Sequence, residues 1–129
     1  MGVMTTNSEP EPAKKTVAVD FDGVLHKWDG EWRGYHVVAG GPVILENGQT
    51  SVAWLYSLAQ NFEVGIFTTR GSSWRGRRAV RAWLRRQASV RQWEDTFRHL
   101  RVTDRKVPAV AYVDDRALRF DGRKFPSAG

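Results

Sequence analysis

The sequence predicts an α/β protein with a Rossmann-like, mainly parallel sheet. Three short apolar segments, each followed by polar residues, alternate with two segments that have the apolar spacing of amphipathic helices. Strands that alternate with such helices favour a parallel sheet. The chain has 129 residues, the size of one ordinary domain, so we expect a single hydrophobic core.

Composition narrows the class of protein. Apolar residues make up 41% of the chain and six residues are Trp, which is enough for a packed core. Cysteine is absent, which excludes disulfides, thiolate nucleophiles and zinc knuckles and leaves oxygen and nitrogen as metal ligands. No apolar run approaches the roughly 18 residues of a membrane span, and no secretory signal is evident. We therefore expect a cytoplasmic protein without a membrane partner.

The chain divides into one domain and two tails. Residues 1–15 contain Ser-Glu-Pro-Glu-Pro and almost no large apolar side chain, which predicts a disordered tail. Residues 16–125 form the expected domain, and residues 126–129 a short C-terminal tail.

The predicted strands are residues 16–21, 65–69 and 109–115, each rich in β-branched or other apolar side chains. The first predicted helix, 48–61, places one set of apolar side chains on a single face: Val52, Leu55, Tyr56 and Ala59. The second, 72–87, does the same with Val80, Trp83, Leu84 and Gln87, and carries Arg78, Arg81 and Arg85 on another side.

Positive charge is concentrated in one part of the chain. The net charge is +6, and 15 of the 20 basic residues are Arg. Residues 70–106 hold twelve basic and three acidic residues, so this stretch is +9 and the remainder is −3. Such a field attracts phosphates, and Arg75, Arg78, Arg81 and Arg85 are the arginines expected to steer a polyanion; a solvated helix face is the alternative.

Two carboxylates end the first predicted strand. Asp20 and Asp22 are separated by one residue, so they project to the same side, and Gly23 frees the backbone to turn away. Acids held this close repel each other unless a cation lies between them. A turn or capping pair is the alternative interpretation, but acids at the end of a buried strand are costly without a purpose.

Further polar groups follow the other strands. Asp114 and Asp115 are hard oxygen ligands of the kind that Mg²⁺ prefers, although they could merely close the strand in a turn. Thr68 offers a hydroxyl beside backbone N–H groups, or is an ordinary strand residue. Lys106 offers a compact positive charge suited to a phosphoryl group. Ligands of open parallel sheets bind at the carboxyl ends of the strands, so these groups predict a metal-assisted phosphoryl-transfer site.

These motifs, in the order Asp20-Phe21-Asp22-Gly23, Thr68, Lys106 and Asp114-Asp115, resemble the haloacid dehalogenase (HAD) superfamily. The chain is most similar to small members without a large cap, including ones common in phage and bacterial genomes. The resemblance covers nearly the whole domain and implies a three-layer, HAD-like sandwich with a minimal cap.

The resemblance also implies roles for the residues. Asp20 would be the nucleophile that forms an aspartyl-phosphate, and Asp22 the acid that protonates the leaving oxygen and then activates water. Mg²⁺ would be held by Asp20, the Asp22 carbonyl and Asp114, with Asp115 acting through water or orienting the others. Thr68 would bind the phosphoryl group, and Lys106 would offset negative charge.

Two features depart from larger relatives. Lys106 precedes Asp114 by only eight residues, which leaves no room for the helix that usually follows this lysine, so Arg105 or Arg70 could share its role. No long insertion follows the first or second motif, so an open site is expected.

A flap is expected after the first motif. Asp29-Gly30 lies between Trp28 and Trp32, a two-residue hairpin signal, and the family has a flap hairpin here. Trp28, Trp32, Thr69 and Arg70 are the expected substrate-binding residues. In the alternative, the two rings pack on Tyr35 or on the core.

The expected protein is a Mg²⁺-dependent phosphatase whose substrates are phosphorylated compounds, with nucleotides and nucleic acid ends favoured by the basic field. Two alternatives remain. One is a small-molecule or sugar phosphatase, with a site that a second subunit could complete, and the other is a nucleic-acid-binding module with weak catalysis on a HAD scaffold. The same scaffold hosts many substrates, so the sequence does not distinguish them.

Overall fold

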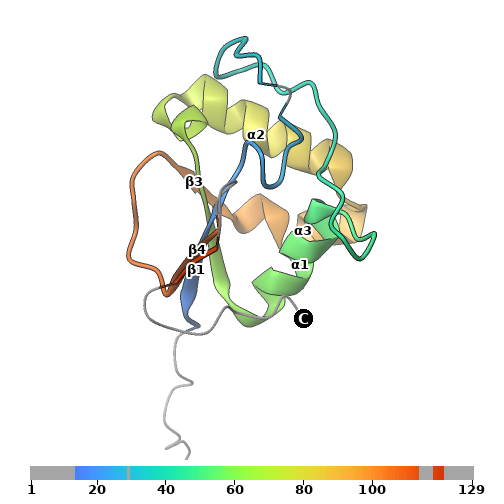
Figure 1. Ribbon diagram of the computed structural model, residues 1–129, viewed down its shortest axis with the longest axis vertical. Coiled ribbons are helices and arrows are strands. Elements are labelled where there is room, and N and C mark those ends of the chain that lie inside the picture. The colour runs from blue at the N-terminus through green and yellow to red at the C-terminus, as the bar shows by residue number, and fades with distance from the viewer. Residues whose placement is uncertain (1–13, 29, 114–117, 121–129) are drawn as a thin grey trace, which may run out of the picture.

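The computed structural model describes residues 14–28, 30–113 and 118–120, and the fold is α/β (Figure 1). Its sheet has the order β3-β2-β1-β4-β5, in which the first four strands are parallel and β5 pairs antiparallel with β4. The strands are β1 (Thr16–Asp20), β2 (Glu63–Phe67), β3 (Arg101–Thr103), β4 (Ala111–Val113) and β5 (Leu118–Phe120). This arrangement is compatible with the expected Rossmann-like sheet.

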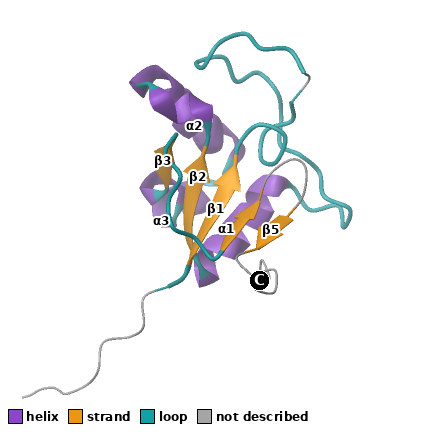
Figure 2. Cartoon of the chain, turned by 60° about the vertical axis from the view of Figure 1, so that its left-hand side comes forward, coloured by secondary structure: helices purple, strands orange, loops and turns teal. Residues whose placement is uncertain are grey.

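The helices begin at side-chain caps. They are α1 (Ser51–Asn61), α2 (Trp74–Gln87) and α3 (Val90–Asp95), with 3₁₀ turns η2 (Thr69–Ser72) and η3 (Phe97–His99) (Figure 2). Thr50 and Ser73 cap α1 and α2 by accepting hydrogen bonds from the backbone N–H groups three residues on. Ser89 and Gln92 form a reciprocal capping box at α3.

The expected strands and helices lie close to their predicted positions. β1, α1 and α2 are shorter than predicted by one to three residues, β4 begins two residues later, and β2 lies two residues earlier. The strand expected at 65–69 ends at Phe67, because Thr68 already caps the η2 turn. One described helix and two described strands were not expected from the sequence: α3, which its Ser-x-x-Gln capping pattern indicates, and the three-residue strands β3 and β5. The expected tails 1–15 and 126–129 lie almost wholly outside the described residues.

All three described helices cover one face of the sheet (Figures 1 and 2). The strand order explains this, because the crossovers from β1 to β2 and from β2 to β3 move in the same direction, and right-handed crossovers then stay on one face. Val17 and Val19 of β1 point into this helical layer and are fully buried. Against them pack side chains of β2, α1 and α2, namely Val64, Ile66, Leu55, Leu58, Val80 and Leu84.

The opposite face is crossed by the segment 104–110 and carries no helix in the part of the chain that the structure describes (Figure 1). The Lys106 ammonium lies 5.0 Å from the centre of the Tyr112 ring, and Tyr112 points away from the buried neighbours Ala111 and Val113. In the residues that the structure describes, the three-layer sandwich expected from the resemblance is therefore corrected to two layers plus this segment. Seven residues that include Pro108 are too few for a crossover helix.

The long connection from β1 to α1 is fixed to the body by Ser51. Its hydroxyl donates to the Leu25 carbonyl at 2.6 Å and accepts from the Val43 N–H at 3.2 Å. Ser51 is fully buried, so these bonds are made away from water. They hold two distant parts of the connection beside the first turn of α1, and thereby position the segment 34–40 that borders the candidate site.

Candidate active site

The carboxyl ends of β1 and β2 lie side by side. Asp20 pairs with Phe67 in the parallel register, so Thr68 follows directly beside the end of β1. One carboxylate oxygen of Asp20 accepts the Phe21 N–H at 2.8 Å, and Asp20 is half-buried. Thr68 is buried, and its hydroxyl accepts the Arg70 N–H at 3.2 Å. The register thus brings together two groups that lie 48 positions apart in the sequence.

A tight turn follows β1. The Phe21 carbonyl accepts hydrogen bonds from the N–H groups of Leu25 and His26, both at 2.9 Å. Gly23 has a φ of 86°, a conformation that favours glycine, and its N–H donates to the His26 carbonyl at 2.9 Å. The turn folds His26 back onto Asp22, which the sequence alone did not indicate.

Asp22 accepts hydrogen bonds from two side chains. Nε and Nη2 of Arg70 approach its two oxygens at 2.9 and 3.1 Å, the fork geometry of a strong arginine–carboxylate pair. Nδ1 of His26 lies 2.9 Å from Oδ1. The Asp22 side chain is 21% exposed, so part of it still faces solvent.

Arg70 joins Asp22 to the segment 34–37. Its third nitrogen, Nη1, donates to the carbonyls of Gly34, Tyr35 and Val37 at 3.2, 2.8 and 2.9 Å. Arg70 is only 1% exposed, so all three of its nitrogens make these bonds in the interior. The expected substrate-binding arginine therefore holds the site together, and we describe it as a positioning residue.

His26 extends the same network to α2. Its Nε2 accepts the Gly40 N–H at 3.0 Å, so the ring proton belongs on Nδ1, where it is donated to Asp22. The Gly40 carbonyl accepts from Nε1 of Trp83 at 2.7 Å. The His26 ring stacks on Phe21 at 5.4 Å and meets the edge of Trp83 at 5.7 Å.

Glycines allow the tight packing behind this network. A Cβ on Gly40 would lie 2.6 Å from the Lys27 carbonyl oxygen and 2.9 Å from Nε2 of His26. A Cβ on Gly76 in the first turn of α2 would lie 1.9 Å from the Arg70 carbonyl oxygen. Both distances are far inside van der Waals contact, so these positions exclude any side chain as long as the backbone stays in place.

The other expected site residues lie in different surroundings. Thr69 is exposed on η2, beside the buried Thr68. Lys106 and the alternative Arg105 are exposed on the segment 104–110, where Lys106 lies over Tyr112 as described above. The expected ligands Asp114 and Asp115 lie outside the described residues, directly after the end of β4.

The flap expected around Asp29-Gly30 is corrected. Residues 26–28 and 30–34 form no ladder of strand pairs in the structure, and Asp29 itself is not described. Trp32 packs instead between Tyr35, at 5.0 Å, and the Arg70 guanidinium, at 5.0 Å, and Trp28 lies 6.1 Å from Trp32. The backbone before the expected turn pairs elsewhere, because His26 forms an antiparallel bridge with Pro42 and the Lys27 N–H donates to the Gly41 carbonyl at 2.8 Å. Both Trp rings remain partly exposed.

Two pockets lie on either side of the segment 36–40. One, of about 310 Å³, is bordered by Trp28, Val37, Gly40, Arg70 and neighbouring residues. The other, of about 320 Å³, is bordered by His36, Val38 and the exposed side of α2. Side chains alternate along this extended segment, so it forms the wall between the two pockets.

The donor set suits a hard cation in part. Asp20 is a half-buried carboxylate at the strand edge, and the chain contains no sulfur ligand from cysteine, which matches the oxygen preference of Mg²⁺. Residues 14–28, 30–113 and 118–120 contain no cluster of three metal-ligating side chains. The expected ligands Asp114 and Asp115 lie outside the residues that were searched for such a cluster.

Comparisons with protein-family models, curated proteins and solved structures find no match to this chain. No helix in the described residues is long and apolar enough to cross a membrane. The geometry of the strand ends therefore carries the functional argument.

Proposed function

We propose that this protein is a Mg²⁺-dependent phosphohydrolase that works through an aspartyl-phosphate on Asp20. The observation that supports this most is the register of β1 and β2, which sets Asp20 beside Thr68 at the carboxyl edge of a parallel sheet. Ligands of such sheets bind at this edge. The resemblance of the four ordered motifs to the HAD superfamily supplies the reaction class.

In the first step a carboxylate oxygen of Asp20 forms a bond to phosphorus, and the bond from phosphorus to the leaving oxygen breaks. The leaving oxygen takes a proton from Asp22. In the second step water gives a proton back to Asp22 and attacks phosphorus, which releases phosphate and restores the Asp20 carboxylate. Thr68 binds the phosphoryl oxygens, and Lys106 offsets their charge.

Mg²⁺ would be held by Asp20, the Asp22 carbonyl and Asp114, with Asp115 orienting these ligands, and would supply charge neutralisation for the transferred phosphoryl group. The chain's own contribution is to fix Asp20 through the Phe21 N–H and to aim Asp22 through Arg70 and His26. A proton on Asp22 competes with these donors for the same oxygens.

That competition favours a second candidate function, a binding module with weak catalysis on the same scaffold. In this alternative the bonds from Arg70 and His26 make Asp22 a structural anchor of the segment 34–40. Phosphate release separates the two. Under the hydrolase proposal, Asp22→Asn loses turnover, while a phosphate mimic such as BeF₃⁻ is still trapped on Asp20 in the presence of Mg²⁺. Under the alternative, wild type itself releases phosphate only weakly.

The test measures phosphate released from p-nitrophenyl phosphate, nucleotides, sugar phosphates and 5′- or 3′-phosphorylated oligonucleotides. We expect activity with Mg²⁺ or Mn²⁺, little with Ca²⁺, whose larger coordination sphere misplaces the reacting groups, and none in excess chelator. Asp20→Asn should abolish turnover without unfolding the protein. Asp95→Asn, the same change on the exposed surface of α3, is the matched control. Near-normal hydrolysis by Asp20→Asn would refute the covalent mechanism.

A further inference from the structure

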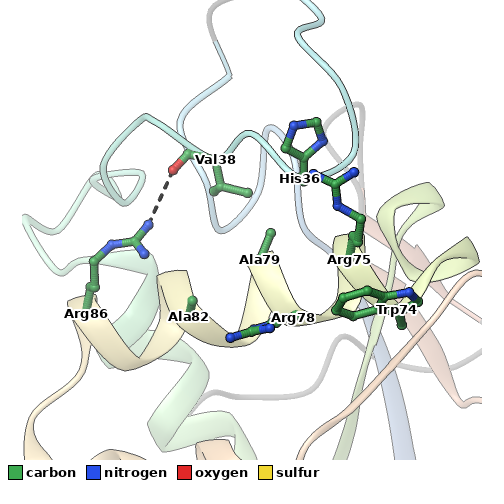
Figure 3. A pocket seen from close by; sticks show the side chains of 8 residues that line it. All are labelled: His36, Val38, Trp74, Arg75, Arg78, Ala79, Ala82 and Arg86. Carbon is green, nitrogen blue, oxygen red and sulfur yellow. Dashed lines mark hydrogen bonds between the residues drawn. The ribbon is translucent and has the colours of Figure 1, made fainter.

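The groove between α2 and the segment 36–38 is lined by positive charge. Figure 3 shows its walls: Arg75, Arg78 and Arg86 from α2 on one side and His36 and Val38 on the other. Ala79 and Ala82 form a low floor between them. Among the lining residues that the structure describes there is no acid, so nothing in the groove neutralises the three guanidinium groups.

The arginines of α2 are not equivalent. Arg77 donates to the Gly71 carbonyl at 2.8 Å, and Arg81 donates to the Leu100 carbonyl at 2.9 Å. Arg85 lies over the Trp93 ring at 5.6 Å. These three are therefore used in packing, which removes Arg81 and Arg85 from the set expected to steer a polyanion.

The groove arginines keep most of their donors. Arg86 makes one long bond, 3.4 Å, to the Val38 carbonyl (Figure 3), which leaves the rest of its fork available. Arg75 and Arg78 are exposed and, within residues 14–28, 30–113 and 118–120, form no hydrogen bond or ion pair. Planar, unneutralised guanidinium groups are well suited to bind phosphate oxygens.

An aromatic ring stands at one end of the groove. Trp74, the first residue of α2, is 62% exposed and borders the same groove. An exposed indole provides a surface on which an unpaired base stacks, an interaction open to every base. Because α2 follows η2 and Thr68 directly, this end of the groove lies toward the carboxyl edge of the sheet.

We propose that the groove lined by Arg75, Arg78, Arg86 and Trp74 binds single-stranded nucleic acid, with the phosphates on the arginines and a base on Trp74. The row from Arg75 to Arg86 rises about 16 Å along the helix, enough for about four to five phosphates of a stacked strand at 3.4 Å per phosphate. A single strand fits this recessed groove, whereas a duplex buries the base faces that Trp74 would contact.

The proposal deepens the proposed function, and rests on it in one respect: the strand would deliver its terminal phosphate to Asp20. Binding is independent of hydrolysis and is measured by fluorescence anisotropy of a labelled 12-nucleotide oligodeoxythymidine in excess chelator, about 12 being long enough to fill the groove. If wild type does not bind the oligonucleotide in excess chelator, this inference alone is overturned. If wild type releases no phosphate in the presence of Mg²⁺, the proposed function alone is overturned.

The central variant is Arg75→Gln with Arg78→Gln, and Arg91→Gln with Arg98→Gln is its control. Both pairs remove two exposed positive charges, but Arg91 and Arg98 lie on α3 and η3 in ion pairs with Asp95 and Glu94. We expect the groove pair to weaken binding at least tenfold and the control pair less than twofold. The slope of log affinity against log salt concentration should be near −2 for wild type, and about 1.4 units shallower for the variant with Arg75→Gln and Arg78→Gln.

Two further variants test the shape of the site. Trp74→Ala should weaken binding about tenfold, the order expected for one stacked base, and Ala82→Glu should do the same by placing a carboxylate on the groove floor. Circular dichroism and thermal unfolding verify that each variant folds. Equal loss in both arginine pairs, or wild-type binding to duplex DNA or inorganic polyphosphate as tight as to the single strand, would overturn the proposal.

Discussion

Replacing Arg70 by Lys should destabilise the protein through the segment 34–37. Lysine keeps the charge but loses the fork, so one ammonium cannot satisfy Asp22 and three carbonyls together. Breaking a buried ion pair costs about 3–5 kcal/mol of folding stability. Because the Asp22 side chain is 21% exposed, we expect the loss of its pair with Arg70 to lie toward the lower end of this range. We expect a loss of about 3 kcal/mol for Arg70→Lys and about 4–5 kcal/mol for Arg70→Met, in which no donor remains.

Urea unfolding followed by Trp fluorescence measures this loss. With about 2.1 cal/mol/K of unfolding entropy per residue, 3 kcal/mol lowers the Tm of a chain of this length by about 11 °C. The control is Arg91→Lys, an exposed position on α3, where the change should be below about 0.5 kcal/mol. A double-mutant cycle with Asp22→Asn should give coupling above about 1 kcal/mol. If Arg70→Lys loses no more stability than the control, or if the losses from Arg70→Lys and Asp22→Asn are additive, Arg70 does not hold Asp22 and the segment 34–37 together.

Three other results follow from the same network. Gly76→Ala should lower the free energy of unfolding in urea by about 2–4 kcal/mol, because the new Cβ would lie 1.9 Å from the Arg70 carbonyl oxygen. The control is Gly65→Ala, whose Cβ would meet nothing within 4 Å. Equal losses for the two variants would contradict this explanation. The His26 ring should carry its proton on Nδ1; if long-range ¹⁵N NMR found the proton on Nε2, the Gly40 N–H could not donate to the ring and the hydrogen-bond network described here would be contradicted. Trp83→Phe should lower the free energy of unfolding by about 2–4 kcal/mol, because the ring is smaller and the Gly40 carbonyl loses its donor. A loss under about 0.5 kcal/mol in thermal unfolding would show that the indole N–H is dispensable.

The sequence determined the local elements because their signals are local. A continuous apolar, β-branched run predicted β1, and apolar spacing predicted α1 and α2. The buried face of α2 was predicted at Val80, Trp83 and Leu84, whereas on α1 the fully buried Leu58 was missed. The acids at the end of β1 and the threonine after β2 were also readable, since each directly follows a strand. That Asp20 and Thr68 lie side by side follows from parallel pairing, and their catalytic roles stay predictions.

Only the tertiary structure decided what holds the site. Arg70 bonds to Asp22 and to carbonyls 33 to 36 residues away, and backbone carbonyls carry no sequence signature by which such partners are found. The turn after β1 closes His26 onto Asp22, a contact that the sequence did not indicate. Likewise, the arginines of α2 look alike in the sequence, and only their neighbours separate those used in packing from those that face an open groove. Helix periodicity fixes the direction of a side chain, whereas its partner depends on which distant segment folds against it.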